Sequence, residues 1–269
     1  MHYDAQKIHT LTASLDELIG AEELKRYIRE TIAVYAHMSD QVSDTIFSRA
    51  LLLSINEGDG LFTWLDRLTE MWQGLLSLED LYLAFYTLKL PVIDDAKDIK
   101  KTSKRDIVLA AIDDDGLLSF SGIRVLCVDI SKWVDHVEDG EFRSVLARLR
   151  LTMQDQMLVF RLPAVDEVTL ARVRQAIEWF MNVDDVYCPP CTIEDYCTYA
   201  MRWLDDHEVL LEGKAKEELF EIIANERRKV DFCGFKSVRR LLDDLTFSVL
   251  MKKKGEAGGQ PAPDEQEDA

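Results

Sequence analysis

The sequence has no long hydrophobic run. None of its apolar stretches approaches the roughly 18 to 20 residues that a membrane-spanning helix needs. The N-terminal stretch MHYDAQKIHT lacks a basic segment followed by an apolar core, so it does not resemble a secretory signal. We therefore expect a cytoplasmic protein with no membrane partner.

Positive charge is scarce in this chain. It has 32 lysines and arginines against 50 aspartates and glutamates, which gives a net charge of −18 at pH 7. An acidic surface repels the phosphate backbone of nucleic acids, so we expect no nucleic-acid partner. Three short basic segments are exceptions, and we interpret each as a solvated loop or helix end: Lys100–Arg105, Glu226–Lys229 and Met251–Lys254.

Cysteines are few and their number is odd. The five cysteines are scattered and do not suggest a disulfide framework. Cys188 and Cys191 form the motif CPPC, but a structural zinc site normally adds a second close pair of cysteines or histidines. A redox CxxC motif is favoured by basic neighbours, which this one lacks. We predict no metal site; a zinc-stabilised binding module using Cys188 and Cys191 stays as an alternative.

The apolar segments predict an α/β fold. Ala50–Ile55, Ile123–Ile130 and Met157–Ala164 are short apolar runs of buried-strand type. Such strands, alternating with helices, favour a parallel sheet that is covered on both faces. Leu61–Leu90 predicts one or two helices, with Gly74 near their boundary.

The sequence pattern becomes entirely helical after Pro190. Three amphipathic segments predict helices: Thr192–His207, Gly213–Lys229 and Val238–Lys253. The polar segment Gly255–Ala269 has no apolar periodicity and predicts a disordered acidic tail.

The segment Leu15–Arg29, LDELIGAEELKRYIR, resembles the box that opens the nucleotide-binding core of AAA+ ATPases, in the branch of CbxX and stage V sporulation protein K. Just before it, Ser14 forms a capping-box pattern with Glu17. The further motifs follow in the family's order: SINEGDGLFT at the Walker A position, VLCVDI at Walker B, YCPPCTIEDYCTYA at the entry to the lid and FCGFKSVRRLLDDL at sensor 2.

This resemblance implies a P-loop NTPase-like (AAA+) fold, with a five-stranded parallel α/β core and a C-terminal α-helical lid. It divides the chain into four parts: an N-terminal extension of residues 1–13, an AAA+-like α/β core of residues 14–187, a helical lid of residues 188–254 and the tail of residues 255–269.

The nucleotide site that the resemblance implies is degenerate. A Walker A loop uses a lysine to neutralise phosphate and a hydroxyl to hold magnesium, but Leu61 and Phe62 occupy these positions. Ile130 replaces the glutamate that polarises water at the end of Walker B. The resemblance retains these candidate nucleotide-binding residues: Asn56, Gly58, Gly60, Thr63, Asp129, Lys236 and Arg239.

The remaining family positions depart as well. Sensor 1 falls at Pro163 and Ala164, which offer no side-chain donor, although Arg161 is near in sequence. The arginine expected at sensor 2 is Ser237. For an arginine finger, Arg172 and Arg174 are candidates without the family's flanking pattern, and we assign no catalytic residue. We therefore expect no tight binding of ATP or ADP with magnesium.

We predict a pseudo-ATPase that acts through protein–protein interaction as a regulatory or scaffold subunit. Its expected partners are further copies of itself, or active AAA+ relatives in a mixed ring. The alternative is an active AAA+ remodelling ATPase with an atypical site, in which Asp129, Thr63 and Lys236 carry the metal, phosphate and sensing roles.

Overall fold

The structure is a computed structural model that describes residues 3–35, 42–90, 123–151 and 156–257; for 42–44 and 249–257 it describes the backbone alone. The chain divides into two compact units, Met1–Pro190 and Cys191–Ala269, and each is described by itself.

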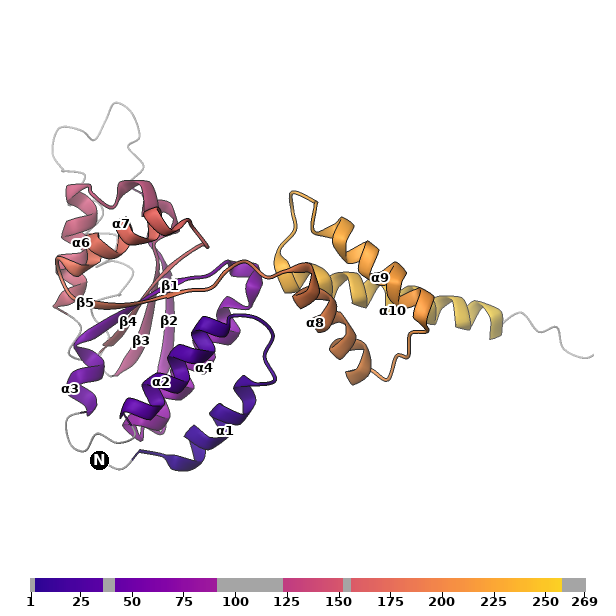
Figure 1. Cartoon of the computed structure of the whole chain (residues 1–269), viewed down its shortest axis with the longest axis horizontal. Coiled ribbons are helices and arrows are strands. Elements are labelled where there is room, and N and C mark those ends of the chain that lie inside the picture. The colour runs from indigo at the N-terminus through magenta and orange to yellow at the C-terminus, as the bar shows by residue number, and fades with distance from the viewer. Residues whose placement is uncertain (1–2, 36–41, 91–122, 152–155, 258–269) are drawn as a thin grey trace, which may run out of the picture. The chain divides into compact units, whose positions relative to one another are not determined.

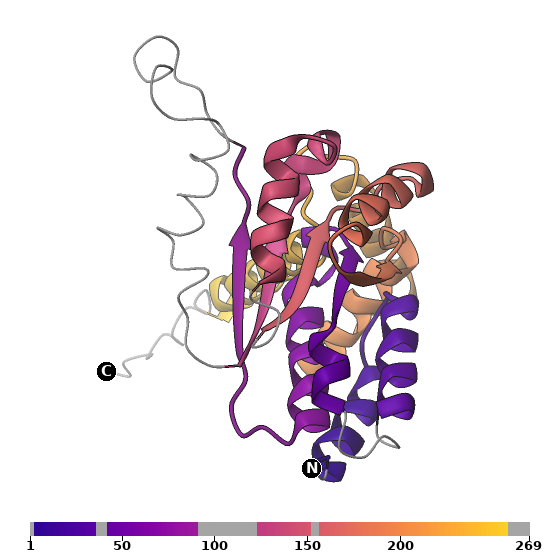
Figure 2. The ribbon, with the colours of Figure 1, turned by 90° about the vertical axis from the view of Figure 1, so that its left-hand side faces the viewer.

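The first unit is built on a five-stranded parallel sheet with the order β2-β3-β4-β1-β5 (Figures 1 and 2). The predicted α/β class with a parallel sheet is confirmed. The strands are β1 (Arg49–Ser54), β2 (Tyr82–Thr87), β3 (Arg124–Asp129), β4 (Gln156–Leu162) and β5 (Asn182–Tyr187).

Helices cover both faces of this sheet (Figure 1). Successive side chains of a strand point to opposite faces, so β1 contributes Leu51 and Leu53 to one core and Leu52 to the other. The first face carries α1 (Ala5–Leu15), α2 (Glu22–Tyr35) and α4 (Leu61–Leu76), and the second carries α6 (Gly140–Arg150) and α7 (Glu167–Glu178). The short α3 (Val42–Phe47) precedes β1.

The prediction of helix throughout Leu61–Leu90 is wrong for its second part. Helix α4 ends at Leu76, and Ser77 follows it in the left-handed region with φ +49°. Residues Tyr82–Thr87, with three aromatic side chains, form β2, which pairs in parallel with β3. Aromatic and β-branched residues favour strands, and pairing with a fully buried neighbour decides their conformation here.

Gly74 lies in the last turn of α4, near the helix boundary as predicted, at the place where α1 packs closely. A Cβ atom at Gly74 would come within 2.7 Å of the Ile8 Cδ1 atom. The Gly74 carbonyl also accepts a hydrogen bond of 2.8 Å from the Asp4 backbone N–H. This glycine therefore permits the close contact between the two helices.

The predicted capping box at Ser14 is wrong. Ser14 lies inside α1, and its hydroxyl donates to the Leu11 carbonyl at 2.9 Å. The N-cap of α1 is Asp4, whose carboxylate accepts from the backbone N–H groups of Gln6 and Lys7. The helix thus begins ten residues earlier than the Ser14 pattern indicated, and its buried side chains belong to the first core.

The second unit is helical throughout its described elements: α8 (Ile193–Asp206), α9 (Gly213–Glu226) and α10 (Gly234–Ala257). A capping box between Thr192 and Asp195 begins α8. Its core gathers aromatic rings, with Tyr196 and Phe235 at 5.1 Å between centroids. Because α10 continues to Ala257, the first three residues of the predicted disordered tail are helical, and the rest lies outside the described residues.

Within the described part of the chain, none of the helices has the length and apolar character needed to cross a bilayer.

Candidate functional site

The first unit has a topological switch point between β1 and β4. These strands are neighbours, but the helices that follow them, α4 and α7, lie on opposite faces of the sheet. In open parallel α/β sheets, ligands bind outside the carboxyl ends of the strands at such a point. The candidate site is therefore the edge where β1, β3 and β4 end, which is where the sequence predicted the Walker A and Walker B positions.

The backbone after β1 makes a tight turn into α4. A short 3-10 helix, η1, spans Glu57–Asp59, and Gly60 follows with φ +86° as the N-cap of α4. That left-handed conformation favours glycine, which explains Gly60 by backbone geometry. Gly58 lies within η1 and needs no such explanation.

Asn56 fastens this turn to the end of β4. Its side-chain oxygen accepts from the Ala164 backbone N–H at 3.1 Å, and its Nδ2 donates to Asp59 Oδ2 at 3.0 Å. Asp59 is buried at 6% exposure, although it lies in the turn that a phosphate would approach. A buried carboxylate at this position opposes the binding of an anion.

The next three residues have distinct environments. Leu61, at the lysine position, is fully buried in the first core. Phe62, at the hydroxyl position, is half exposed and packs against Phe85 of β2, with ring centroids 5.2 Å apart. Thr63 is exposed on the first turn of α4. The position that holds a lysine in the family thus points into hydrocarbon.

Arg161 at the end of β4 fills the centre of the edge. Its Nε donates to the Ile55 carbonyl at 3.0 Å, and its Nη1 lies 3.2 Å from Asp129 Oδ2 and 3.0 Å from Ser131 Oγ. Arg161 is 6% exposed and Asp129 9% exposed. One guanidinium therefore ties together the ends of β1, β3 and β4.

Asp129 has no oxygen left without a donor. Its Oδ1 accepts from the backbone N–H of Ser131 at 3.0 Å and from the Ser131 hydroxyl, while its Oδ2 is paired with Arg161. Ser131 begins η2 (Ser131–His136). Ile130, between Asp129 and Ser131, is fully buried, and its side chain cannot act as a base. A metal ion bound to Asp129 would lie beside the Arg161 guanidinium and be repelled by its charge.

The buried thiols Cys127 and Cys188 of the first unit are poor nucleophiles in the folded chain. Burial raises the pKa of Cys127 far above its usual range, and the nearby Asp129 charge adds to the effect. Burial likewise raises the pKa of Cys188 to about 12. Among the described residues, no group of three or more His, Cys, Asp or Glu side chains is arranged to hold a metal ion.

The remaining two candidates belong to the second unit. Lys236 and Arg239 occupy exposed positions of α10. Ser237, at the sensor 2 position, is buried, and its hydroxyl accepts from the Cys233 backbone N–H at 2.8 Å. Its role here is to stabilise the start of the helix. The site that can be described is therefore that of the first unit, with Asn56, Gly58, Gly60, Thr63 and Asp129.

Arg161 and Asp59 are not among the predicted site residues, although both are buried charged residues at the candidate site. The signal for Arg161 is a lone charged residue in the apolar strand Met157–Ala164, because a buried charge requires a partner. Asp59 gave no such signal, since glycine-flanked acids are common in exposed turns.

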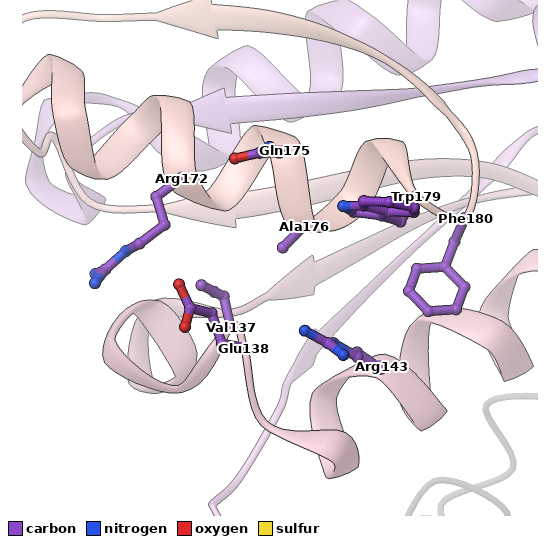
Figure 3. A pocket seen from close by; sticks show the side chains of 8 residues that line it. All are labelled: Val137, Glu138, Arg143, Arg172, Gln175, Ala176, Trp179 and Phe180. Carbon is purple, nitrogen blue, oxygen red and sulfur yellow. The ribbon is translucent and has the colours of Figure 1, made fainter.

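A separate pocket of about 530 Å³ lies between α7 and the segment from η2 to α6 (Figure 3). Arg172 and Trp179 line it from α7, and Glu138 and Arg143 line it from the other side. Arg172 donates to the Val134 carbonyl at 3.1 Å, and the Trp179 side chain is 79% exposed. None of its lining residues belongs to the predicted nucleotide site.

No protein-family model matches the chain, and no curated protein is significantly similar to it. Solved structures are similar at low identity. One is a Walker-type ATPase of Pyrococcus abyssi (13% identity, 90% of this chain and 76% of that chain, TM-score 0.37). Another is domain III of the Thermotoga maritima replication initiation protein DnaA (12% identity, 92% of this chain and 90% of that chain, TM-score 0.41). A third is a chain of the E. coli HORMA:CdnC:Trip13 complex (15% identity, 88% of this chain and 85% of that chain, TM-score 0.47). Similarity at this level identifies no function.

Proposed function

We propose that this chain is a degenerate AAA+-like module that does not hydrolyse ATP and acts through protein–protein contact. The observation that carries the proposal is the position of Arg161, whose guanidinium joins Ile55, Asp129 and Ser131 at the carboxyl edge of the sheet. The centre of the candidate nucleotide site is then occupied by the protein's own cation.

Hydrolysis of a nucleoside triphosphate needs a cation at the phosphates, a metal ligand and a group that orients water. In this chain the buried Leu61 cannot supply the first, Asp129 is already paired, and Ile130 cannot supply the third. Asp59 and Glu57 add negative charge to the turn. Weak residual contact with ATP or ADP remains compatible with this arrangement; catalysis does not.

A module without catalysis is expected to work as a binding surface. Two large apolar side chains of the α7 region support this role: Val168 and Trp179 are each 79% exposed. Tryptophan and arginine are enriched where interfaces gain most of their binding energy, and both Arg172 and Trp179 line the pocket of Figure 3, with Gln175 and Ala176 between them. We propose a regulatory or scaffold subunit, assembled with further copies or with active relatives.

The proposal is tested by phosphate release from ATP with purified chain and magnesium. We expect a rate equal to that of buffer, in the unchanged chain and in Asp129→Ala alike. A rate above buffer that Asp129→Ala abolishes would contradict the proposal and support an active ATPase with an atypical site. Adding Thr63→Ala, an exposed substitution, distinguishes a catalytic hydroxyl from contamination.

A further inference from the structure

The second unit carries an apolar groove of about 620 Å³ on its own surface. The end of α8, the segment that follows it, α9 and α10 all line this groove. Its walls are mainly aliphatic, and the charged side chains among its lining residues are two carboxylates, Glu208 and Glu218. The groove therefore suits an apolar segment that also carries positive charge.

Part of this apolar lining is open to solvent. The side chains of Leu210, Ile222 and Leu245 are 91%, 38% and 38% exposed, and all three line the same groove. Single exposed leucines are ordinary on protein surfaces, but several that converge in one hollow mark an interaction site.

Helix α10 is longer than the helices that it packs against. It has 24 residues, whereas α8 and α9 have 14 each. At 1.5 Å per residue, α10 is roughly 15 Å longer than either neighbour, and its C-terminal end extends beyond α9 (Figure 1).

The described side chains of α10 that follow Leu242 are not buried. Val238 and Leu242 are buried in the first half, but none of the described side chains from Asp243 to Ser248 is buried. Phe247 is 64% exposed. An amphipathic helix normally gains its stability by packing an apolar face, so this half of α10 has the character of a docking element.

The sequence at the end of α10 matches the groove. Val249–Lys254 reads VLMKKK, with three apolar residues and then three lysines. The groove offers the complement, an aliphatic floor with two carboxylates. Leu245 belongs to the unburied stretch Asp243–Ser248 of α10 and also lines the groove, so the two surfaces are adjacent.

We propose that the C-terminal half of α10 docks into this groove of a second copy of the chain, and that the second copy does the same in return. Such a reciprocal contact is the geometry of a two-fold symmetric dimer, in which the same surface serves both partners. The positive charge of residues 252–254 in the sequence of one copy complements the carboxylates Glu208 and Glu218 of the other. This inference deepens the proposed function, since it rests on a module that acts through protein contact, and it names the surface.

Sedimentation velocity of the full chain tests this directly. We expect a monomer–dimer equilibrium that shifts with concentration up to about 100 μM. Leu210→Asp and Ile222→Asp should each weaken the dimer by about tenfold or more. Val230→Asp is the matched control, because Val230 is fully exposed in the same unit and outside the groove. Circular dichroism checks that each variant keeps its helices.

Charge reversal makes the test specific. Glu208→Lys with Glu218→Lys should weaken the dimer, as should Lys252→Glu with Lys253→Glu. An equal mixture of the two variants should form a heterodimer, because both of its reciprocal contacts again join opposite charges. A chain that is monomeric at every concentration, an equal effect of Val230→Asp, or no heterodimer in the mixture would each overturn the inference. None of these measurements involves nucleotide. The dimer proposal can therefore be wrong while the proposed lack of ATP hydrolysis is right, and the dimer can exist in a chain that does hydrolyse ATP.

Discussion

Arg161 and Asp129 form a buried ion pair at the carboxyl edge of the sheet, with Arg161 Nη1 3.2 Å from Asp129 Oδ2. The pair joins β4 to β3, and the second donor of Arg161 reaches β1 through the Ile55 carbonyl. Open parallel α/β sheets bind ligands at this edge, but here the side chains bind one another.

Removing one member of this pair should be costly. We expect Arg161→Met to lower the free energy of unfolding by about 3 to 5 kcal/mol, because it leaves the Asp129 carboxylate buried without its cation. Chemical denaturation followed by circular dichroism measures the change. Arg172→Met is the control: Arg172 pairs with an exposed Asp135, and such pairs contribute about 1 kcal/mol or less.

The double variant Arg161→Met with Asp129→Leu should be more stable than Arg161→Met alone, since no uncompensated charge remains. If Arg161→Met costs no more than Arg172→Met, the pair does not organise the edge.

Restoring a lysine at the Walker A position should not restore nucleotide binding. Leu61 is fully buried, so Leu61→Lys places an ammonium in the hydrophobic core, and we expect a loss of about 2 to 5 kcal/mol in the free energy of unfolding. Thr63→Lys, two residues on and exposed, should change it by about 0.5 kcal/mol or less. A stable Leu61→Lys variant that binds ATP would show that the turn is still a working phosphate loop.

The class of the fold could be predicted from the sequence because three of its strands are continuous apolar runs. β1, β3 and β4 are buried on both faces, so their apolar runs are continuous. The pattern of β2 does not indicate a strand, because this strand lies at the edge of the sheet and all its residues are half-buried or exposed, which weakens the apolar signal. Tertiary pairing with β3, rather than local pattern, determines that strand.

The sequence shows which residues of the candidate site lack the chemistry of a nucleotide site, but it does not show which side chains fill the space. Leu61, Phe62 and Ile130 could be identified from sequence as residues without the needed chemistry. That Arg161 fills the gap depends on three strand ends, and Ile55 and Arg161 are 106 residues apart. Spacing along the chain cannot reveal such a contact.

Gly74 should resist substitution even though it lies in a helix. Alanine normally favours a helix over glycine by about 1 kcal/mol. Here its Cβ would come within 2.7 Å of Ile8 Cδ1, so we expect Gly74→Ala to be destabilising by about 1 to 3 kcal/mol. Adding Ile8→Val, which removes Cδ1, should recover part of the loss. Gly140→Ala, where the Cβ meets nothing within 4 Å, should cost nothing; if both alanines behave alike, the packing of α1 on α4 is not tight.

Cys188 should be unreactive in the folded protein. Because burial raises the pKa of its thiol to about 12, the thiol stays protonated at pH 8 and reacts slowly with iodoacetamide. Cys233 is partly exposed and should be alkylated first, while all five cysteines react after denaturation. Mass spectrometry of tryptic peptides over time gives the order. Rapid labelling of Cys188, protected by added zinc, would instead favour a metal-binding CPPC motif.

We propose that the carboxyl edge of the sheet does not bind nucleotide tightly. Calorimetric titration of the purified chain with ATP and with ADP, each with and without magnesium, measures this most directly. We predict no binding tighter than a Kd of about 10 μM under any of these conditions. Magnesium-dependent binding of ATP tighter than that value, weakened by Asp129→Ala, would contradict the account.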